Sequence, residues 1–295
     1  MQLPAAAIQD RVDAIRSDNR SGSVELTRQA ADALLEAASL DPFRPGLEKT
    51  CVALVRAQPS MASIVNLASI ALWNGVSPAS LRSVCRQFTG QLDEANRRIS
   101  GHARQLIRDG QKVLTYSRSR TVVDALIGAH NAGASFEVLC TESRPMGEGI
   151  KLARDLAEAG IPVRLSTDAA LFRLAQQASL IIVGADALTN QSVVNKTGTS
   201  MLVMAGRHLS CSTYVLSGSE KFVPRGYRLP GEESKPASEI SAEPLPGVQI
   251  DNRYFESVPL GWIAAFITEE GRLTSWQLRE RLQHNEAHPL LTSDS

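Results

Sequence analysis

The sequence carries no net charge, because 31 basic side chains balance 31 acidic ones among 295 residues. Such a balance creates no long-range field to attract nucleic acid or an anionic membrane, so we expect neither as a partner. No stretch approaches the ~20 consecutive apolar residues of a membrane-spanning helix. The first residues also lack the basic and apolar regions of a signal peptide. We therefore expect a cytoplasmic protein.

Cysteines, aromatic residues and standard phosphate motifs are also scarce. Cys51, Cys85, Cys140 and Cys211 form no CxxC pair and have no histidine at ligand spacing. This spacing argues against a zinc site and a disulfide framework, and we expect no metal and no cofactor. Neither GxGxxG nor GxxxxGK[ST] occurs. Aromatic residues make up 5% of the chain, so the core must consist mainly of Ala, Leu, Ile and Val.

Residues 1–110 are predicted to form a helical N-terminal domain. Apolar residues recur at helical spacing in five stretches, which are 8–15, 24–38, 63–73, 79–88 and 92–107. Their alanine-rich faces suit close helix packing. A helical bundle is the simplest interpretation.

Residues 111–295 show a different pattern, in which short apolar runs alternate with amphipathic stretches of helical length. The runs are 113–115, 136–140, 162–166, 180–183 and 212–216. Continuous apolar runs are typical of parallel strands that helices cover on both faces. The repeated strand-then-helix order predicts an α/β domain with a Rossmann-like, doubly wound parallel sheet.

The last part of the chain is less regular. Residues 218–256 are rich in Pro, Gly, Ser and Glu, which indicates a long loop. A final helix is expected over 274–282, where Thr274 and Gln277 can form a capping box. The tail from 288 to 295 is expected to be frayed.

Polar residues follow each predicted strand, where open α/β sheets bind ligands. Five basic residues could approach one crevice beside helix starts, an arrangement that binds phosphate; they are Arg118, Arg120, Arg144, Lys196 and Lys221. Asp186, in a Gly-Ala-Asp turn, could act as a general acid or base on a sugar hydroxyl.

Simpler interpretations stay open for these residues. An Asp after a strand is often a helix cap, and the arginines could be solvated or paired with acids. Residues 195–198 could be only a turn before a helix. Cys140 is expected to be a core thiol, and the five histidines are given no role.

Six strand-end motifs, taken in order, resemble a known superfamily. They are Thr115–Val122, Glu142–Pro145, Thr167–Ala170, Gly184–Ala187, Asn195–Thr199 and Ser219–Phe222. The superfamily contains the regulatory alpha, beta and delta subunits of translation initiation factor 2B. It also contains sugar-phosphate isomerases that act on methylthioribose 1-phosphate or ribose 1,5-bisphosphate. Residues 20–23, 58–61, 252–259 and 267–271 fall at further family motifs, so the resemblance spans nearly the whole chain.

The resemblance implies a phosphorylated sugar or nucleotide bound between a helical and a Rossmann-like domain. It also implies a homodimer or larger assembly formed mostly through the C-terminal domain. In the isomerases, a Cys and an Asp convert an aldose phosphate to a ketose phosphate, and the Asp matches Asp186. Further substrate-binding positions are expected at Arg20, Gly22, Arg118, Glu142, Arg144, Asn195, Lys196 and Lys221.

Two positions depart from the isomerase pattern. Ser117 takes the place of the Cys, and a hydroxyl is a far weaker acid than a thiol. Gln58 takes the place of an Arg, which removes a bidentate phosphate contact. Three interpretations therefore remain. The chain is a divergent isomerase that uses Asp186 and Ser117, a non-catalytic sensor of a sugar phosphate or nucleotide, or a structural subunit. The nearly complete motif set makes the structural subunit the least favoured.

Overall fold

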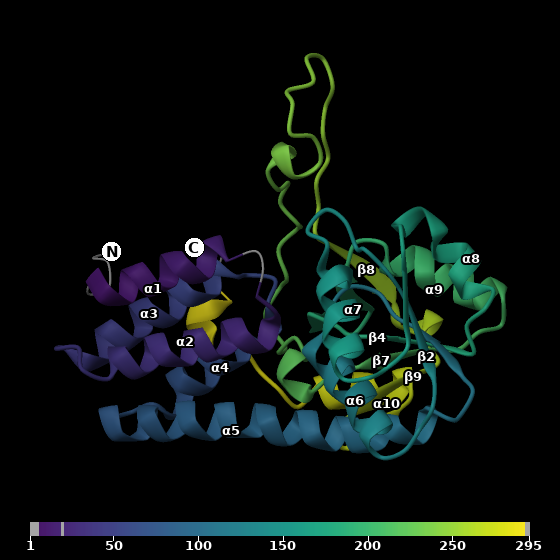
Figure 1. Ribbon diagram of the computed structural model, residues 1–295. Helices are drawn as coiled ribbons and strands as arrows, with labels where there is room; N and C mark the ends of the chain where they lie inside the picture. Colours follow the sequence, from purple (N-terminus) through teal and green to yellow (C-terminus); the bar gives the residue numbers. More distant parts are fainter. Residues whose placement is uncertain (1–5, 19–20, 293–295) are drawn as a thin grey trace.

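The computed structural model describes residues 6–18 and 21–292, and its first part is the predicted bundle of helices. The helices, purple to blue in Figure 1, are α1 (Ala6–Ser17), α2 (Ser23–Ala37), α3 (Phe43–Ala57), α4 (Ala62–Asn74) and α5 (Pro78–Ala103). Their buried faces meet in one core that consists mostly of Ala, Leu, Ile and Val. The expected helical N-terminal region is confirmed.

Two details of the bundle differ from the prediction. Residues 79–88 and 92–107 were expected as separate helices, but 78–103 form the single helix α5 and 104–106 a short 3-10 turn. Gly90 lies inside α5, where a glycine costs only about 1 kcal/mol and does not break the backbone. Helix α3 was not predicted, because Pro45 and Gly46 in its first turn look like breakers. Proline is tolerated in a first turn, where its missing N–H has no partner to lose.

The remaining chain forms a mostly parallel sheet. Its strands are β1 (Lys112–Leu114), β2 (Glu137–Thr141), β3 (Val163–Ser166), β4 (Leu180–Val183), β7 (Thr213–Leu216), β9 (Ala265–Thr268) and β10 (Gly271–Leu273). All five predicted strands are present. The spatial order is β10-β9-β7-β4-β1-β2-β3, with β10 alone antiparallel to its neighbour. The six parallel strands therefore follow the 3-2-1-4-5-6 order of doubly wound α/β folds.

Helices cover both faces of this sheet. One face packs on α5, α6 (Arg120–Asn131) and α7 (Glu148–Glu158), and the other on α8 (Leu171–Ala175), α9 (Thr199–His208) and α10 (Ser275–Leu282). Strand β4 illustrates the consequence, because Leu180 and Ile182 face the first group and Ile181 and Val183 the second. Burial on both faces explains the continuous apolar runs. Figure 1 shows α5 running beneath both the bundle and the sheet.

A small second sheet was not predicted. It joins β5 (Ala187–Leu188), β6 (Ser192–Lys196) and β8 (Phe255–Pro259) in antiparallel pairs. Asn195 and Lys196 therefore end a strand, whereas a simple turn was one interpretation of residues 195–198. Strand β8 begins at Phe255, 59 residues after Lys196 at the end of β6, so no local sequence pattern predicts this pairing.

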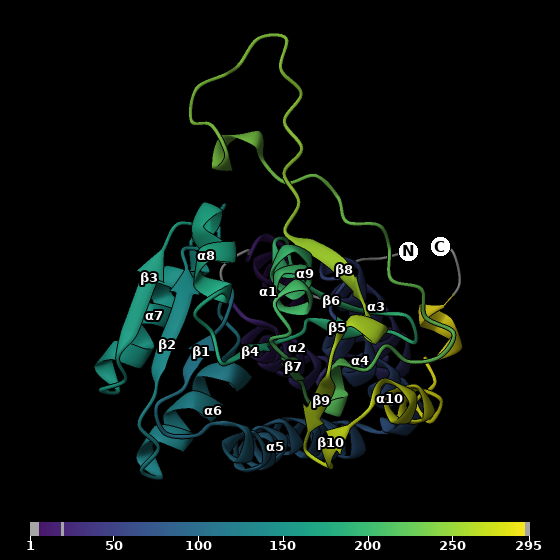
Figure 2. The same cartoon turned by 90° about the vertical axis from the view of Figure 1, so that its right-hand side faces the viewer.

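The irregular region after β7 is present as expected, whereas the tail differs. Residues 218–254 contain only the short 3-10 helices η3 (Ser219–Lys221) and η4 (Ala237–Glu239), and part of this loop projects from the body in Figures 1 and 2. The capping box of Thr274 and Gln277 is confirmed at the start of α10.

The prediction of a frayed tail is wrong for residues 288–291. Pro289–Leu291 form a 3-10 helix, and Leu291 is 9% exposed in the core of the bundle. The ring of His288 lies 4.5 Å from that of Trp73. Apolar contact with the bundle holds this segment, and residues 293–295 lie outside the described part. The C-terminal segment packs on the bundle, and α5 packs on both the bundle and the sheet region. The predicted boundary between two domains near residue 110 therefore stays a prediction. Within the described residues, no helix has the length and apolarity to cross a membrane.

Candidate functional site

A cavity of about 450 Å³ lies at the carboxyl ends of β1 and β4, between the sheet and the bundle. Strands β2 and β3 lie on one side of β1, and β4 and β7 on the other, so the winding of the chain reverses at this point. Ligands of open α/β sheets bind at such a reversal. The cavity walls include the loops after β1 and β4, the end of β6, and parts of α2 and α5.

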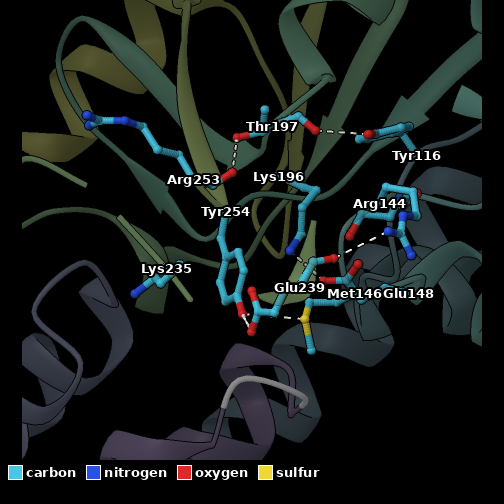
Figure 3. Close-up of polar contacts among 12 residues, drawn as sticks. Tyr116, Arg144, Met146, Glu148, Lys196, Thr197, Lys235, Glu239, Arg253 and Tyr254 are labelled. Carbon is cyan, nitrogen blue, oxygen red and sulfur yellow. Dashed lines mark hydrogen bonds and ion pairs between the residues drawn. The ribbon is translucent and has the colours of Figure 1, made fainter. Parts of the chain in front are cut away.

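The structure brings most of the predicted site residues to this cavity. Those that line it are Gly22, Ser117, Arg118, Arg120, Asp186, Asn195, Lys196 and Lys221. Glu142 and Arg144 are not among its lining residues. The backbone N–H of Arg144 donates to Asp168 Oδ2 over 2.7 Å. Its guanidinium donates to the carbonyl of Glu239 over 3.3 Å (Figure 3). Arg20 lies outside the described residues.

Two glycines allow the loops around the cavity to meet. A Cβ atom on Gly184 would lie 2.5 Å from Cβ of Ser119, so only glycine lets the β4 loop lie against the β1 loop. A Cβ atom on Gly198, where φ is +107°, would lie 2.4 Å from the hydroxyl oxygen of Tyr116. That hydroxyl donates to the carbonyl of Thr197 over 2.9 Å (Figure 3). The end of β1 is thus fixed against both neighbouring loops.

Asp186 shares the cavity with two buried lysines. Lys221 is 3% exposed, and its ammonium donates to the carbonyl of Ala185 over 2.7 Å; Lys196 is 5% exposed. Burial raises the pKa of the Asp186 carboxyl, while the charges of Lys221 and Lys196 act in the opposite direction and Glu148 raises the pKa further. A carboxyl in this setting is suited to carry a proton and act as an acid.

Lys196 makes an ion pair that the sequence did not reveal. Its Nζ lies 2.5 Å from Glu148 Oε1 and 4.6 Å from the ring centre of Tyr254 (Figure 3). Glu148 is the first residue of α7, and no role was predicted for it from the sequence. The residue belongs to the cavity wall all the same.

Helix starts contribute backbone N–H groups to the cavity. The residues at the starts of α2 and α6, with N-caps Gly22 and Ser119, line it, and neither N-cap residue makes a side-chain capping hydrogen bond. Uncapped helix starts attract anions. Helix α9 differs, because Glu256 Oε1 accepts hydrogen bonds from the N–H groups of Gly198 and Ser200 over 2.8 and 2.7 Å. A carboxylate therefore already occupies the start of α9.

Most cations of the cavity have a carboxylate partner. The pairs are Arg28–Asp93, Arg118–Asp155, Arg120–Asp124, Lys196–Glu148 and Lys235–Glu232. Of these basic residues, Arg28 and Lys235 were not predicted. Lys235 comes from the long loop after β7, where no residue-level signal marks it. An arriving phosphate would compete with these carboxylates for the cations.

Gln58 also lines the cavity, but its side-chain amide forms a hydrogen bond within the bundle. Its Nε2 donates to the carbonyl of Ile15 over 2.8 Å. Gln58, at the position where the family resemblance predicts an Arg, therefore helps to hold α1. Within the described residues, no group of three or more His, Cys, Asp or Glu is arranged to hold a metal ion.

Two other cavities contain none of the predicted site residues. One of about 590 Å³ lies between α4, α5 and the C-terminal segment. The charged residues that line it are Glu94, Glu220, Glu269 and Glu286 together with Arg98, so the acidic residues outnumber the arginine. Carboxylates repel phosphate, so this cavity does not suit a phosphorylated ligand. The other, of about 890 Å³, lies between residues 189–194 and 223–232. The cavity at the ends of β1 and β4 is the candidate site.

Comparison with known proteins identifies the family. A model of the Initiation factor 2 subunit family matches residues 19–275. The ribose 1,5-bisphosphate isomerase of Archaeoglobus fulgidus is 30% identical, over 90% of this chain and 88% of its own length. A putative translation initiation factor eIF-2B subunit 2-like protein of Pyrococcus horikoshii is 32% identical, over 87% of this chain and 92% of its own. The solved structure of the Pyrococcus horikoshii translation initiation factor eIF-2B superposes with a TM-score of 0.82 at 29% identity, over 91% of this chain and 97% of that one. The chain therefore belongs to the Initiation factor 2 subunit family.

Proposed function

We propose that this protein binds a phosphorylated pentose between its bundle and its sheet, and isomerises it from an aldose to a ketose form. The observation that carries the proposal is the position of Asp186, a carboxyl with a raised pKa beside Lys196 and Lys221. An acid of this kind can move protons between sugar oxygens. The name of the Archaeoglobus relative supplies the substrate class.

The cavity offers two places for phosphate. The start of α2 belongs to the bundle and the start of α6 to the sheet region, and residues of both line the cavity. Each presents backbone N–H groups beside a basic residue, Arg28 near one and Arg118 near the other. A sugar with a phosphate at each end would use both.

Ser117 takes a positioning role in this proposal. Its backbone has a φ of +60°, and its N–H donates to Ser143 Oγ over 2.9 Å, which fixes its residue at the cavity wall. A serine hydroxyl does not lose its proton readily without a base. Ser117 is therefore assigned a hydrogen bond to a sugar oxygen near the reacting carbons.

A non-catalytic sensor of a sugar phosphate or nucleotide is the second candidate. Ser117 and Gln58, which replace the isomerases' Cys and Arg, favour it, as does the name of the Pyrococcus relative. The two candidates share the ligand class and differ in turnover.

One experiment separates them. Thermal denaturation is followed with ribose 1,5-bisphosphate, ribose 5-phosphate and AMP, and conversion of the bound sugar is then followed by NMR. A ligand at one hundred times its dissociation constant adds about 2.7 kcal/mol of stability. Conversion that is lost in Asp186→Asn supports the isomerase, and binding without conversion supports the sensor. Absence of any stabilisation by these ligands refutes both.

We further propose a homodimer formed mostly through the sheet region. Phe172 of α8 and Met201 and Met204 of α9 expose large apolar side chains on neighbouring helices. Exposed apolar patches of this kind mark interfaces. Light scattering should give twice the chain mass, and Met204→Lys should shift the mass toward one chain. A monomeric wild type refutes the dimer.

A further inference from the structure

The two carboxylate oxygens of Glu148 have different surroundings. Oε1 is paired with Lys196 at 2.5 Å, whereas Oε2 is buried and has no hydrogen-bond partner among the described residues. The whole side chain is 16% exposed and lines the cavity. An unpaired buried oxygen costs free energy, so its placement calls for a functional reason.

The surrounding backbone fixes Glu148 in this place. A Cβ atom on Gly149, the next residue, would lie 1.7 Å from the carbonyl oxygen of Thr141, so α7 begins in direct contact with the end of β2. The N–H of Gly149 also donates to the carbonyl of Glu142 over 3.1 Å. The start of α7 and the ammonium of Lys196 both favour a negative charge at Glu148.

Asp186 lines the same cavity and feels the charge of the same lysine, Lys196, but it forms no ion pair with that lysine. Lys196, which pairs directly with Glu148, acts on Asp186 only as a nearby charge, and the negative charge of Glu148 favours the protonated form of Asp186. Two carboxyl groups whose surroundings separate them in this way divide the roles of base and acid. Lys196 is paired directly with Glu148 and not with Asp186, whereas burial raises the pKa of Asp186.

We propose that Glu148 is the second proton-transfer group of this site, the base that the Ser117 hydroxyl cannot be, with Asp186 as its acid. This inference rests on the proposed isomerase function. It assigns the proton transfer between C2 and C1 to Glu148. This residue matches neither the Cys nor the Asp of the family's isomerases, whose positions here are Ser117 and Asp186.

The reaction of a C1-phosphorylated pentose ring balances with these two groups. The Glu148 carboxylate takes the proton from C2, the electrons of that bond form the C1=C2 double bond, the C1–O4 bond breaks, and Asp186 gives its proton to O4. In the second half, protonated Glu148 gives its proton to C1 while Asp186 takes the proton of the C2 hydroxyl and C2=O forms. Both carboxyl groups return to their first state, and no oxidant or reductant is needed.

The test compares wild type with Glu148→Gln, Glu148→Asp and the control Glu158→Gln, which alters an exposed glutamate at the far end of the same helix. Conversion of ribose 1,5-bisphosphate is measured by NMR, with ordinary substrate and with substrate deuterated at C2. For Glu148→Gln we expect kcat to fall by about 10²–10⁴-fold with KM within a few-fold, because general-base catalysis contributes that much. Glu148→Asp should have an intermediate kcat, and wild type should show a primary isotope effect. The control should match wild type.

The outcomes distinguish this inference from the function on which it rests. A wild type that binds but does not convert the sugar refutes the proposed isomerase and this inference together. A wild type that converts it while Glu148→Gln keeps its kcat refutes the inference alone. A change confined to KM also refutes it, since this is the signature of a residue that only positions Lys196. If Glu148→Gln fails to fold, as judged by thermal denaturation, an unchanged kcat in folded Glu148→Asp is the refuting result.

Discussion

The hydroxyl of Tyr254 donates a hydrogen bond of 2.5 Å to Glu239 Oε1, and this contact fastens the long loop after β7 to the wall of the candidate site (Figure 3). Burial, followed by the hydrogen bond to Glu239, raises the pKa of the Tyr254 phenol, so the phenol remains a donor. Asn252 donates to the other carboxylate oxygen of Glu239 over 2.8 Å. Lys235, in the same loop, reaches the cavity.

Tyr254→Phe is therefore expected to loosen residues 232–252 without unfolding the protein. The variant loses one hydrogen bond to a charged acceptor, which is worth about 1.5–3 kcal/mol. The free energy needed to open the loop locally should fall by this amount, while the free energy of global unfolding should change little. Hydrogen exchange followed by mass spectrometry should be faster in peptides of this segment and unchanged in α4. Unchanged exchange in the loop would mean that the tyrosine does not hold it.

Gly184→Ala should destabilise the protein and weaken ligand binding. The new methyl group would approach Ser119 Cβ to 2.5 Å and push apart the loops that carry Ser119 and Asp186. Overpacking of this kind costs about 1–3 kcal/mol, measurable by urea denaturation. Gly101→Ala is the matched control, because Gly101 lies in helix α5 with open space around it. The control should gain up to about 1 kcal/mol, and equal effects of the two changes would contradict the packing argument.

Asp186→Asn should stabilise the protein at neutral pH and have little effect in acid. Because folding raises the pKa of Asp186 above its ordinary value near 3.8, the folded state binds its proton more tightly than the unfolded state. The stability that this proton contributes is fully present below the ordinary value and is lost as pH rises through the raised one. Melting temperatures of both forms from pH 3.5 to 8 should diverge as pH rises. A gap that widens toward low pH would contradict the raised pKa.

Leu291→Ala should lower stability by about 2 kcal/mol, the lower end for a buried leucine, because Leu291 anchors the end of the chain in the bundle. Leu290→Ala serves as the control, since Leu290 is 38% exposed. Urea denaturation should separate the two variants clearly. Equal, small losses would show that the tail adds nothing to the bundle.

The sequence predicts the parts of the fold that have a local signal. Burial on both faces makes β4 a continuous apolar run, and Thr274 and Gln277 mark the start of α10 through their own side chains. Asp186, Lys196 and Lys221 were predicted because each follows a recognisable strand or motif, and all three line the cavity. What the sequence missed depends on distant partners: β6 pairs with β8, and the tail packs on the bundle.

In the candidate site, too, the residues without a local sequence signal were missed. No sequence motif pointed to Glu148, and only the position of Lys196 in three dimensions reveals its pairing. Lys235 lies in a loop of polar composition, where nothing distinguishes a cavity residue from a solvated one. Glu142 and Arg144 follow a predicted strand end, but the turn around Asp168 holds their segment outside the cavity wall.

Helix α5 limits how the candidate site can open. With 26 residues it is a rod of about 39 Å at 1.5 Å per residue, and it is joined to the bundle at one end and to α6 at the other. Because the bundle and the sheet region both pack on this one helix, they cannot move apart freely. A ligand of this cavity would therefore enter on the side away from α5, where the long loop after β7 lies (Figure 1) and contributes Lys235 and Tyr254 to the wall.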